Sequence, residues 1–193
     1  KNIMQDELKK RIITSIIIFI LSIFSIFSNF LIFISSLILI SYFIFKEISK
    51  INYLIKKKNI FFRNFLSLLY IIILFDFSAI ALYKVLGPVF IFYILTICIS
   101  SDIGGYVVGK KIGGKKLTKI SPNKTISGSV GSFSFSILPL FIFSIFDQQE
   151  YLYSINNFLF CLEVSFACQL GDLFISYLKR KANVKDTGKI LPG

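Results

Sequence analysis

Apolar residues occur in long runs along this chain, and short clusters of polar and charged residues separate the runs. The longest run extends almost unbroken from Ile12 to Phe45, and within it only the break at Ser28-Asn29 contains a residue more polar than Ser, Thr or Tyr. A run of about twenty apolar residues is long enough for one helix to cross about 30 Å of hydrocarbon. The pattern therefore predicts an all-α fold, a polytopic transmembrane helical bundle, and not a water-soluble domain.

The breaks between the runs predict about six membrane helices in a single domain, residues 1–193. A turn is expected at Lys84–Pro88, and a Gly/Lys-rich loop is expected over 102–127. The six expected helices cover residues 12–28, 30–45, 65–83, 89–101, 128–146 and 157–178.

The basic residues support this topology. The net charge is +12, and 21 of the 22 Lys and Arg residues fall in four clusters, at 1–11, 46–63, 109–124 and 179–193. Six alternating helices would place these four clusters on one side, which the positive-inside rule assigns to the cytoplasm. We therefore expect a multi-pass protein of the inner (plasma) membrane, with its basic loops and active site cytoplasmic. The charge then needs no nucleic-acid partner, although anionic lipid headgroups could also attract it.

Composition excludes several kinds of chemistry. The chain contains no histidine, so it cannot by itself form a Ser-His-Asp triad, a His-ligated zinc site or an imidazole base. Its three cysteines, Cys98, Cys161 and Cys168, all lie in apolar runs, and their number is odd. This argues against a disulfide framework and against a thiolate metal site.

Carboxyl groups within the apolar runs require an explanation, because inserting such a group in a membrane costs about 2.5–3.5 kcal/mol. Asp102 and Asp172 are expected near the cytoplasmic ends of their helices, where they could bind a ligand. Asp76 and Glu163 are deeper and have no motif around them. We interpret these two as structural, either hydrogen bonded between helices or protonated.

Polar residues in the last expected helix recur at spacings of 4, 3, 4 and 3, which places them on one face. They are Ser165, Gln169, Asp172, Ser176 and Lys179. One interpretation is a helix lining a hydrated pocket that holds a metal ion and phosphates. The other is a polar seam between two helices, which membrane proteins also use. The sequence does not distinguish the two.

The loop expected over 102–127 combines glycines, which allow close approach of an anion to the backbone, with lysines that supply positive charge. Gly104 to Lys110 fits most of a P-loop pattern, but Lys111 occupies the Ser/Thr position, so we reject a P-loop. A solvated connector would explain the lysines. It would not explain Asp102 or the Ser121-Pro-Asn-Lys-Thr125 turn.

Taken together, these motifs resemble the phosphatidate cytidylyltransferase (CDP-diacylglycerol synthase) family. In the middle of the chain, the resemblance rests on Asp102-x-x-Gly-Tyr, Gly109-Lys-Lys-Ile-Gly-Gly-Lys, Ser121-Pro-Asn-Lys-Thr and Gly128. It is sharper at Gly171-Asp-Leu-Phe-Ile-Ser-Tyr-Leu-Lys-Arg180 and Lys185-Asp-Thr-Gly188. The spacing Ser-x-x-Lys-Arg-x4-Lys-Asp is the first half of the family signature.

The resemblance implies transfer of a cytidylyl group from CTP to phosphatidic acid at a bilayer surface, giving CDP-diacylglycerol and pyrophosphate. It leaves a homodimer open. It implies Mg²⁺ as cofactor, with Asp102, Asp172 and Asp186 as metal ligands. The implied catalytic residues are Asp172, Ser176, Lys179 and Arg180. The residues implied to bind CTP or phosphate are Lys110, Lys111, Ser121, Lys124, Thr125 and Lys185.

The chain departs from the family pattern at three places. Ile175 and Ser127 stand where many members have Glu, and the chain ends at Gly193 where the family continues into further acidic motifs and another membrane helix. We therefore expect a fragment truncated at the C-terminus. Two other functions stay open, an inactive fragment and a transporter or channel-like protein whose Asp-bearing helices line a pathway. A transporter should carry its polar residues through the midplane, not gather them at one surface.

Overall fold

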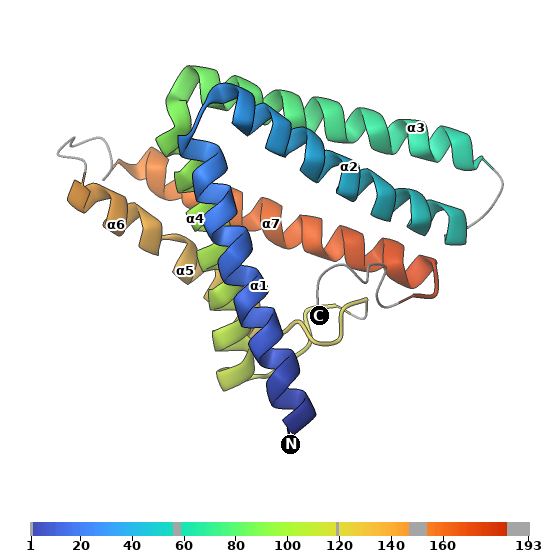
Figure 1. Cartoon of the computed structure of the whole chain (residues 1–193). Coiled ribbons are helices and arrows are strands. Elements are labelled where there is room, and N and C mark those ends of the chain that lie inside the picture. The colour runs from blue at the N-terminus through green and yellow to red at the C-terminus, as the bar shows by residue number, and fades with distance from the viewer. Residues whose placement is uncertain (1, 56–58, 119, 147–153, 185–193) are drawn as a thin grey trace. The chain divides into compact units, whose positions relative to one another are not determined.

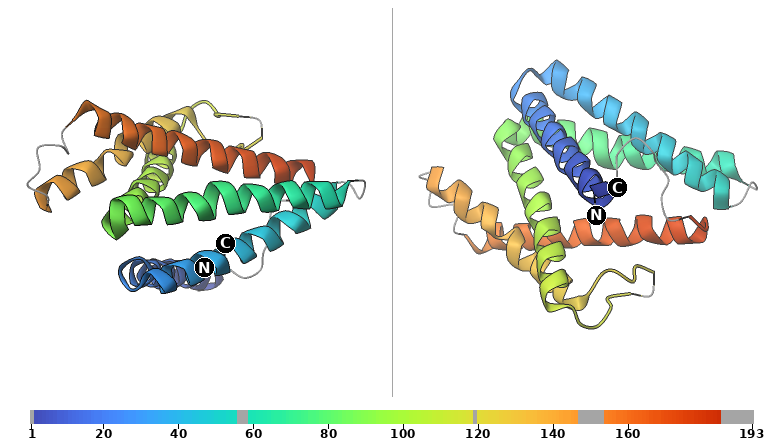
Figure 2. Two further views of the ribbon diagram at one scale, coloured as in Figure 1. Left: turned by 90° about the horizontal axis from the view of Figure 1, so that it is seen from above. Right: turned by 60° about the horizontal axis from the view of Figure 1, so that its bottom comes forward.

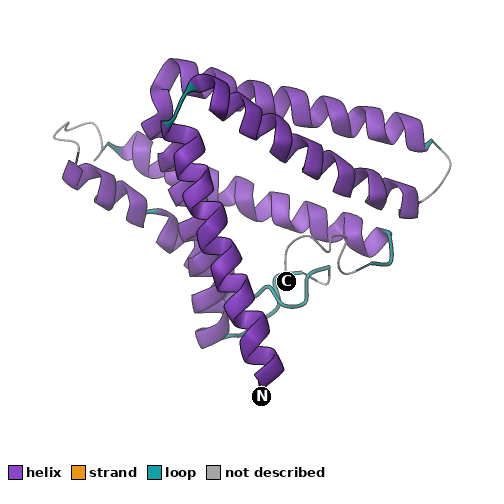
Figure 3. Cartoon of the chain, in the orientation of Figure 1, coloured by secondary structure: helices purple, strands orange, loops and turns teal. Residues whose placement is uncertain are grey.

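The computed structural model describes residues 2–55, 59–118, 120–146 and 154–184. These residues are almost entirely helical, as Figure 3 shows, and they form no strand beyond one isolated bridge between Lys116 and Thr125. The predicted all-α fold is confirmed. The described residues fall into two compact units, one drawn from Lys1–Ile91 and Lys181–Gly193 and the other from Phe92–Arg180.

In the first unit, the helix break falls at the predicted polar pair. Helix α1 (Asn2–Phe27) ends where both the backbone N and the side-chain Oγ of Ser28 donate to Phe24 O, at 3.0 and 2.6 Å. Helix α2 (Phe30–Ile55) begins directly after Asn29, whose carbonyl accepts from Phe33 N. Ser28 and Asn29 thus supply the local hydrogen bonds that favour a helix end over a continuous helix.

Helix α2 lies beside α3 (Ile60–Tyr70), which continues into a π-helical turn, η1 (Ile71–Phe77) (Figure 1). Asp76, within η1, accepts a hydrogen bond of 2.6 Å from Ser41 Oγ on α2. The contact agrees with the structural interpretation of this intramembrane carboxyl group.

Helix α4 (Ser78–Ile112) crosses the position of the expected turn without a loop. Gly87 has φ 82° and ψ 175°, which breaks the helical geometry at one residue, and Pro88 follows it without an N–H to donate. The predicted turn is therefore a kink inside a helical run that extends from Ile60 to Ile112.

Within the described residues, four helices are long and apolar enough to cross a membrane, so the chain is a polytopic membrane protein. They are Phe30–Ile55, Ile60–Ile112, Ile126–Ile145 and Ile155–Lys181, and the apolar part of α1, Ile13–Phe27, is shorter. The predicted number of about six is not confirmed.

The loop expected over residues 102–127 is also shorter than predicted. Helix α4 continues to Ile112, so Asp102, Lys110 and Lys111 lie on a helix and only residues 113–125 form the connection. Glycine has a low helix propensity, which made this segment look like a loop. Tertiary packing of the same glycines keeps it helical.

The second unit contains the C-terminal part of α4 together with α5 (Ile126–Ser136), α6 (Leu138–Phe146) and α7 (Ile155–Lys181). Glycines bring α4 and α5 into backbone contact, and Figure 2 shows the two helices crossing. A Cβ at Gly104 would lie 2.4 Å from Gly131 O, and one at Gly131 would lie 2.5 Å from Val108 Cβ. No side chain fits at either position, which is how small residues permit close helix crossings in membranes.

Candidate active site

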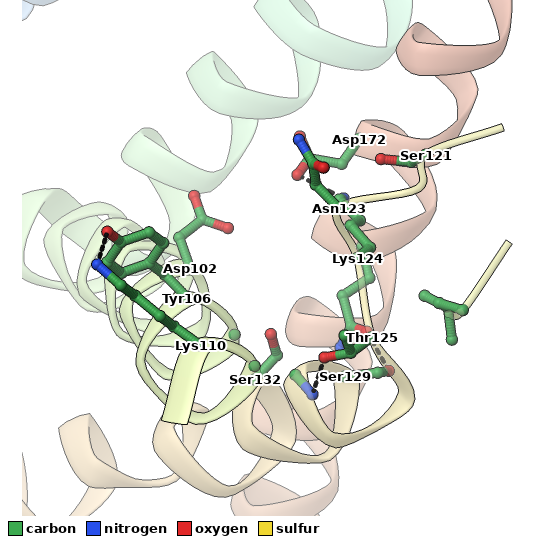
Figure 4. Close-up of a pocket in the computed structure, with 15 residues that line it drawn as sticks. Asp102, Tyr106, Lys110, Ser121, Asn123, Lys124, Thr125, Ser129, Ser132 and Asp172 are labelled. Atoms are coloured by element: carbon green, nitrogen blue, oxygen red, sulfur yellow. Dashed lines mark hydrogen bonds and ion pairs between the residues drawn. The ribbon is translucent and has the colours of Figure 1, made fainter. Parts of the chain in front are cut away.

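A cavity of about 760 Å³ opens between the end of α4, the connection 113–125, α5 and α7. Most of the residues that line it are polar residues or glycines, and Figure 4 shows them facing a common space. Six of the site residues predicted from the sequence line it: Asp102, Lys110, Ser121, Lys124, Thr125 and Asp172.

The connection 113–125 folds back on itself and thereby positions Lys124. Its two arms pair at the Lys116–Thr125 bridge, with Leu117 N donating to Lys124 O at 2.8 Å. A turn closes the outer end, where Lys124 N donates to Ser121 O at 3.1 Å. These backbone bonds fix the Lys124 backbone, so that its side chain reaches α7.

Thr125 ends this connection and starts α5. Its backbone is extended, and its Oγ1 accepts a hydrogen bond of 3.1 Å from Gly128 N, which is an ordinary threonine N-cap. Gly128 and Ser129, in the first turn of α5, both line the cavity. The positive end of the α5 dipole therefore lies at the cavity wall, where it favours an anion.

Lys124 Nζ and Asp172 Oδ2 form an ion pair of 2.8 Å across the cavity, between the connection and α7. Asp102 lines the same cavity from α4 (Figure 4). Lys110 lines the cavity from a position further along α4. Its Nζ donates to the hydroxyl of Tyr106 at 3.3 Å and lies 5.4 Å from the centre of the Tyr106 ring. The cavity thus combines two carboxylates with two lysines, an arrangement suited to a phosphorylated ligand and a cation.

The polar stripe of α7 contributes to a helix seam at its N-terminal end and to the cavity wall further along. At its N-terminal end it is a helix seam, because Ser165 Oγ lies 2.8 Å from Ser101 Oγ and both residues are fully buried. One turn on, Gln169 Oε1 accepts from Ser129 Oγ of α5 at 2.5 Å. At the next turn Asp172 reaches the cavity. The seam therefore leads directly to the site.

Other predicted site residues lie away from the cavity wall. Lys111 is exposed on α4 next to Lys110, and Ser176 and Lys179 follow Asp172 along α7 without lining the cavity. Arg180 lies near the end of α7, and its Nε donates to Ile120 O at 3.4 Å. Lys185 and Asp186 lie outside the described residues.

Sequence reasoning missed several residues of the wall, namely Tyr106, Asn123, Ser129, Ser132 and Gln169. A signal existed for three of them, and for Asn123 it was the Ser121-Pro-Asn-Lys-Thr125 turn. Tyr106 follows Asp102 by four residues, so the two share a helix face once the segment is taken as helical. Gln169 belongs to the polar stripe but was given no role.

Two carboxylates face the cavity, so a divalent cation held by them would need further ligands to complete its shell. Within the described ranges, no group of three potential metal-ligating Asp, Glu, Cys or His side chains occurs. Mg²⁺, however, usually takes one or two carboxylates and completes its shell with water and substrate phosphates. The pair Asp102 and Asp172 fits that donor set, and a preformed all-protein metal cage is absent from the part of the chain described.

Comparisons with a protein-family model and with known proteins both point to cytidylyltransferases. The sequence model that describes the cytidylyltransferase family matches residues 55–193. A phosphatidate cytidylyltransferase of Helicobacter pylori is 38% identical over 118 residues, which are 61% of this chain and 43% of that protein. Those of Bacillus subtilis and Rickettsia bellii are 44% and 45% identical over 108 and 100 residues, covering 55% and 49% of this chain.

The matched segments cover 40% of the Bacillus subtilis protein and 43% of the Rickettsia bellii protein. The chain therefore matches less than half of the length of each of these relatives. No solved structure matches it.

Proposed function

Because this chain belongs to the cytidylyltransferase family, we propose that it transfers a cytidylyl group from CTP to phosphatidic acid, forming CDP-diacylglycerol and pyrophosphate. The three relatives compared above are all named phosphatidate cytidylyltransferase. The observation that carries the proposal is the cavity in which Lys124 pairs with Asp172 while Asp102 and Lys110 line the same space.

The proposed reaction suits these groups. The phosphate of the lipid attacks the α-phosphorus of CTP, and such transfers depend mainly on positioning and on neutralising the charge of the phosphate oxygens. Lys110 and Lys124 approach the cavity from different elements, so they can contact different phosphates of one nucleotide. The hydroxyl groups of Ser121 and Thr125 add hydrogen bonds to the same ligand.

We propose that Asp102 and Asp172 hold Mg²⁺ in this cavity, with Asp186 as a third ligand. The ion would neutralise charge on the nucleotide phosphates when bound. Asp172 now accepts from Lys124, so ligand binding requires the two side chains to separate or to share the ligand. Lys124 would then turn from the carboxylate to a phosphate oxygen, keeping its charge paired throughout.

The residues beyond Asp172 complete the proposed site. Ser176, Lys179 and Arg180 follow it on α7, and Lys111 lies beside Lys110 at the end of α4. We assign these residues, with Lys185, to the outer part of the substrate site. There they would attract the headgroup of a lipid that enters sideways from the bilayer.

The proposed topology keeps six membrane crossings. The kink at Gly87 divides the run Ile60–Ile112 into two arms, each about 40 Å long at 1.5 Å per residue. Either arm exceeds the roughly 30 Å of a hydrocarbon core. Two crossings there, with one each for α2, α5–α6 and α7, give five, and we propose α1, whose apolar part Ile13–Phe27 is shorter, as the sixth. The basic clusters and the cavity would then face the cytoplasm at the inner membrane.

The test is enzymatic. Full-length protein purified in detergent should convert labelled CTP and phosphatidic acid to CDP-diacylglycerol only when Mg²⁺ is present. Asp172→Asn should abolish the product, because it removes a charge from both the proposed metal site and the ion pair. Glu163→Gln is the matched control, since Glu163 is exposed on the same helix away from the cavity. Wild-type turnover in Asp172→Asn would contradict the proposal.

A further inference from the structure

Two cysteines from distant parts of the chain lie side by side in the second unit. Cys98 on α4 and Cys168 on α7 are 70 positions apart, yet their Sγ atoms are separated by only 3.1 Å. Both thiols are free and half-buried. The third cysteine, Cys161, is fully buried and hydrogen bonds with the hydroxyl of Tyr93 at 3.1 Å. The chain thus contains one close thiol pair and one separate thiol.

On both helices the thiol pair lies one turn away from a carboxylate of the cavity. Cys98 precedes Asp102 by four residues on α4, and Cys168 precedes Asp172 by four residues on α7. Residues four apart in a helix lie on the same face, one turn from each other. The two sulfur atoms therefore meet between α4 and α7, the same two helices that carry Asp102 and Asp172. They lie one helical turn before these carboxylates in the sequence of each helix.

We propose that Cys98 and Cys168 form a modification site, a dithiol that closes reversibly to a disulfide with a lipid-soluble oxidant of the quinone class. Two S–H bonds break and one S–S bond forms. The two electrons and two protons pass to the quinone, which becomes a hydroquinone. Thiol reductants reverse the reaction by exchange. A quinone suits the site because both thiols lie within helices apolar enough to span a membrane, where a lipid-soluble reagent has access.

The geometry requires little movement. A disulfide has an S–S distance of about 2.0 Å, so the sulfur atoms must approach by about 1 Å. Closing the bond ties α4 to α7 one turn from Asp102 and Asp172, whereas the reduced pair leaves that spacing adjustable. Since intracellular disulfides are usually transient, we assign the reduced pair to the resting protein and the disulfide to oxidising conditions.

The site is tested by counting thiols. Detergent-purified protein is treated with tetramethyl-1,4-benzoquinone, whose ring is fully substituted and cannot add thiols. It is then unfolded, labelled with a maleimide and weighed by mass spectrometry. The wild type should fall from three reactive thiols to one, and Cys161→Ser from two to none. Cys98→Ser and Cys168→Ser should each keep both remaining thiols. A wild type that retains three thiols, or equal losses in Cys98→Ser, would overturn the proposal.

A second measurement needs no variant. Digestion of the oxidised wild type should yield a peptide that joins Cys98 to Cys168, lighter by two hydrogen atoms than its separate parts. The disulfide should also raise the thermal unfolding midpoint, and dithiothreitol should restore the original value. A covalent dimer on a non-reducing gel in place of the internal link would overturn the proposal. None of these readouts depends on nucleotidyl transfer, so they are independent of the proposed function.

Discussion

Lys124 Nζ lies 2.8 Å from Asp172 Oδ2, although 48 positions separate the two residues in the chain. The side chains are 31% and 62% exposed, so water screens the pair. Exposed ion pairs typically contribute about 0–1 kcal/mol to stability. The fold therefore does not depend on this contact. Its position in the cavity fits the proposed ligand, which would compete for both charges.

Lys124→Met should separate the two roles. The free energy of unfolding should change by less than about 1 kcal/mol. Turnover of CTP by the full-length protein should fall about 100-fold, since one preorganised charge facing a phosphate is typically worth this much. Lys115→Met, on the same connection but outside the cavity wall, is the control. An equal loss in the control would show that net charge, and not this lysine, matters.

The sequence predicted those features of the fold and of the site that depend on local pattern. The break at Ser28-Asn29, the all-helical fold and the polar face of α7 follow from runs and spacings that neighbouring residues determine. The family resemblance, also based on short motifs, is confirmed by the match over residues 55–193. Each of these features can be recognised without knowing which helices are neighbours.

The sequence could not predict features that depend on helix–helix contact. Gly104 and Gly105 suggested a loop, because glycine disfavours an isolated helix, but their packing on α5 keeps α4 helical to Ile112. Likewise, the sequence assigned no role to Ser129, because its partner Gln169 lies on another helix, α7, and the contact between α5 and α7 is not visible in the sequence. The spacing of the α7 stripe was compatible with a helix seam and with a pocket wall. Which of the two a given residue belongs to depends on the side chains that it contacts on other helices.

Gly104→Ala should destabilise the protein, because the new methyl group would overlap Gly131 O and Phe135 Cβ at about 2.5 Å or less. Overpacking of this kind costs roughly 1–3 kcal/mol, and we expect a lower thermal unfolding midpoint. Gly171→Ala on α7 is the matched control, since apart from the adjacent backbone of its own helix no atom lies within 4 Å of the place that its new methyl group would take. There the better helix former should leave stability unchanged or raise it by up to about 1 kcal/mol. Equal midpoints for the two variants would argue against a tight α4–α5 crossing.

The buried pair Ser101 and Ser165 should behave non-additively. Ser101→Ala or Ser165→Ala alone leaves one hydroxyl group without its partner across the α4–α7 contact. Each should cost roughly 0.5–2 kcal/mol in unfolding free energy, and the double variant should cost less than the sum. A double-mutant cycle in detergent measures the difference. Strict additivity would mean that the two hydroxyl groups do not interact.

The kink at Gly87 decides how often the run Ile60–Ile112 crosses the bilayer. Its total length, 53 residues, is about 80 Å as a straight helix, well beyond a hydrocarbon core of about 30 Å. A single crossing would leave an apolar arm in water. We therefore expect Lys84, next to the kink, to lie on the opposite side of the membrane from Lys46 and Lys115.

Labelling of single cysteines tests this topology. Each of the three lysines is replaced by cysteine in a background without Cys98, Cys161 and Cys168, and sealed vesicles are treated with a membrane-impermeant maleimide. Lys46→Cys and Lys115→Cys should react from one face and Lys84→Cys only from the other. Reaction of all three from one face would mean that the kink does not return the chain across the membrane. In that case the positive-inside argument for a cytoplasmic cavity would fail with it, because the 21 clustered cations would no longer be separated from Lys84.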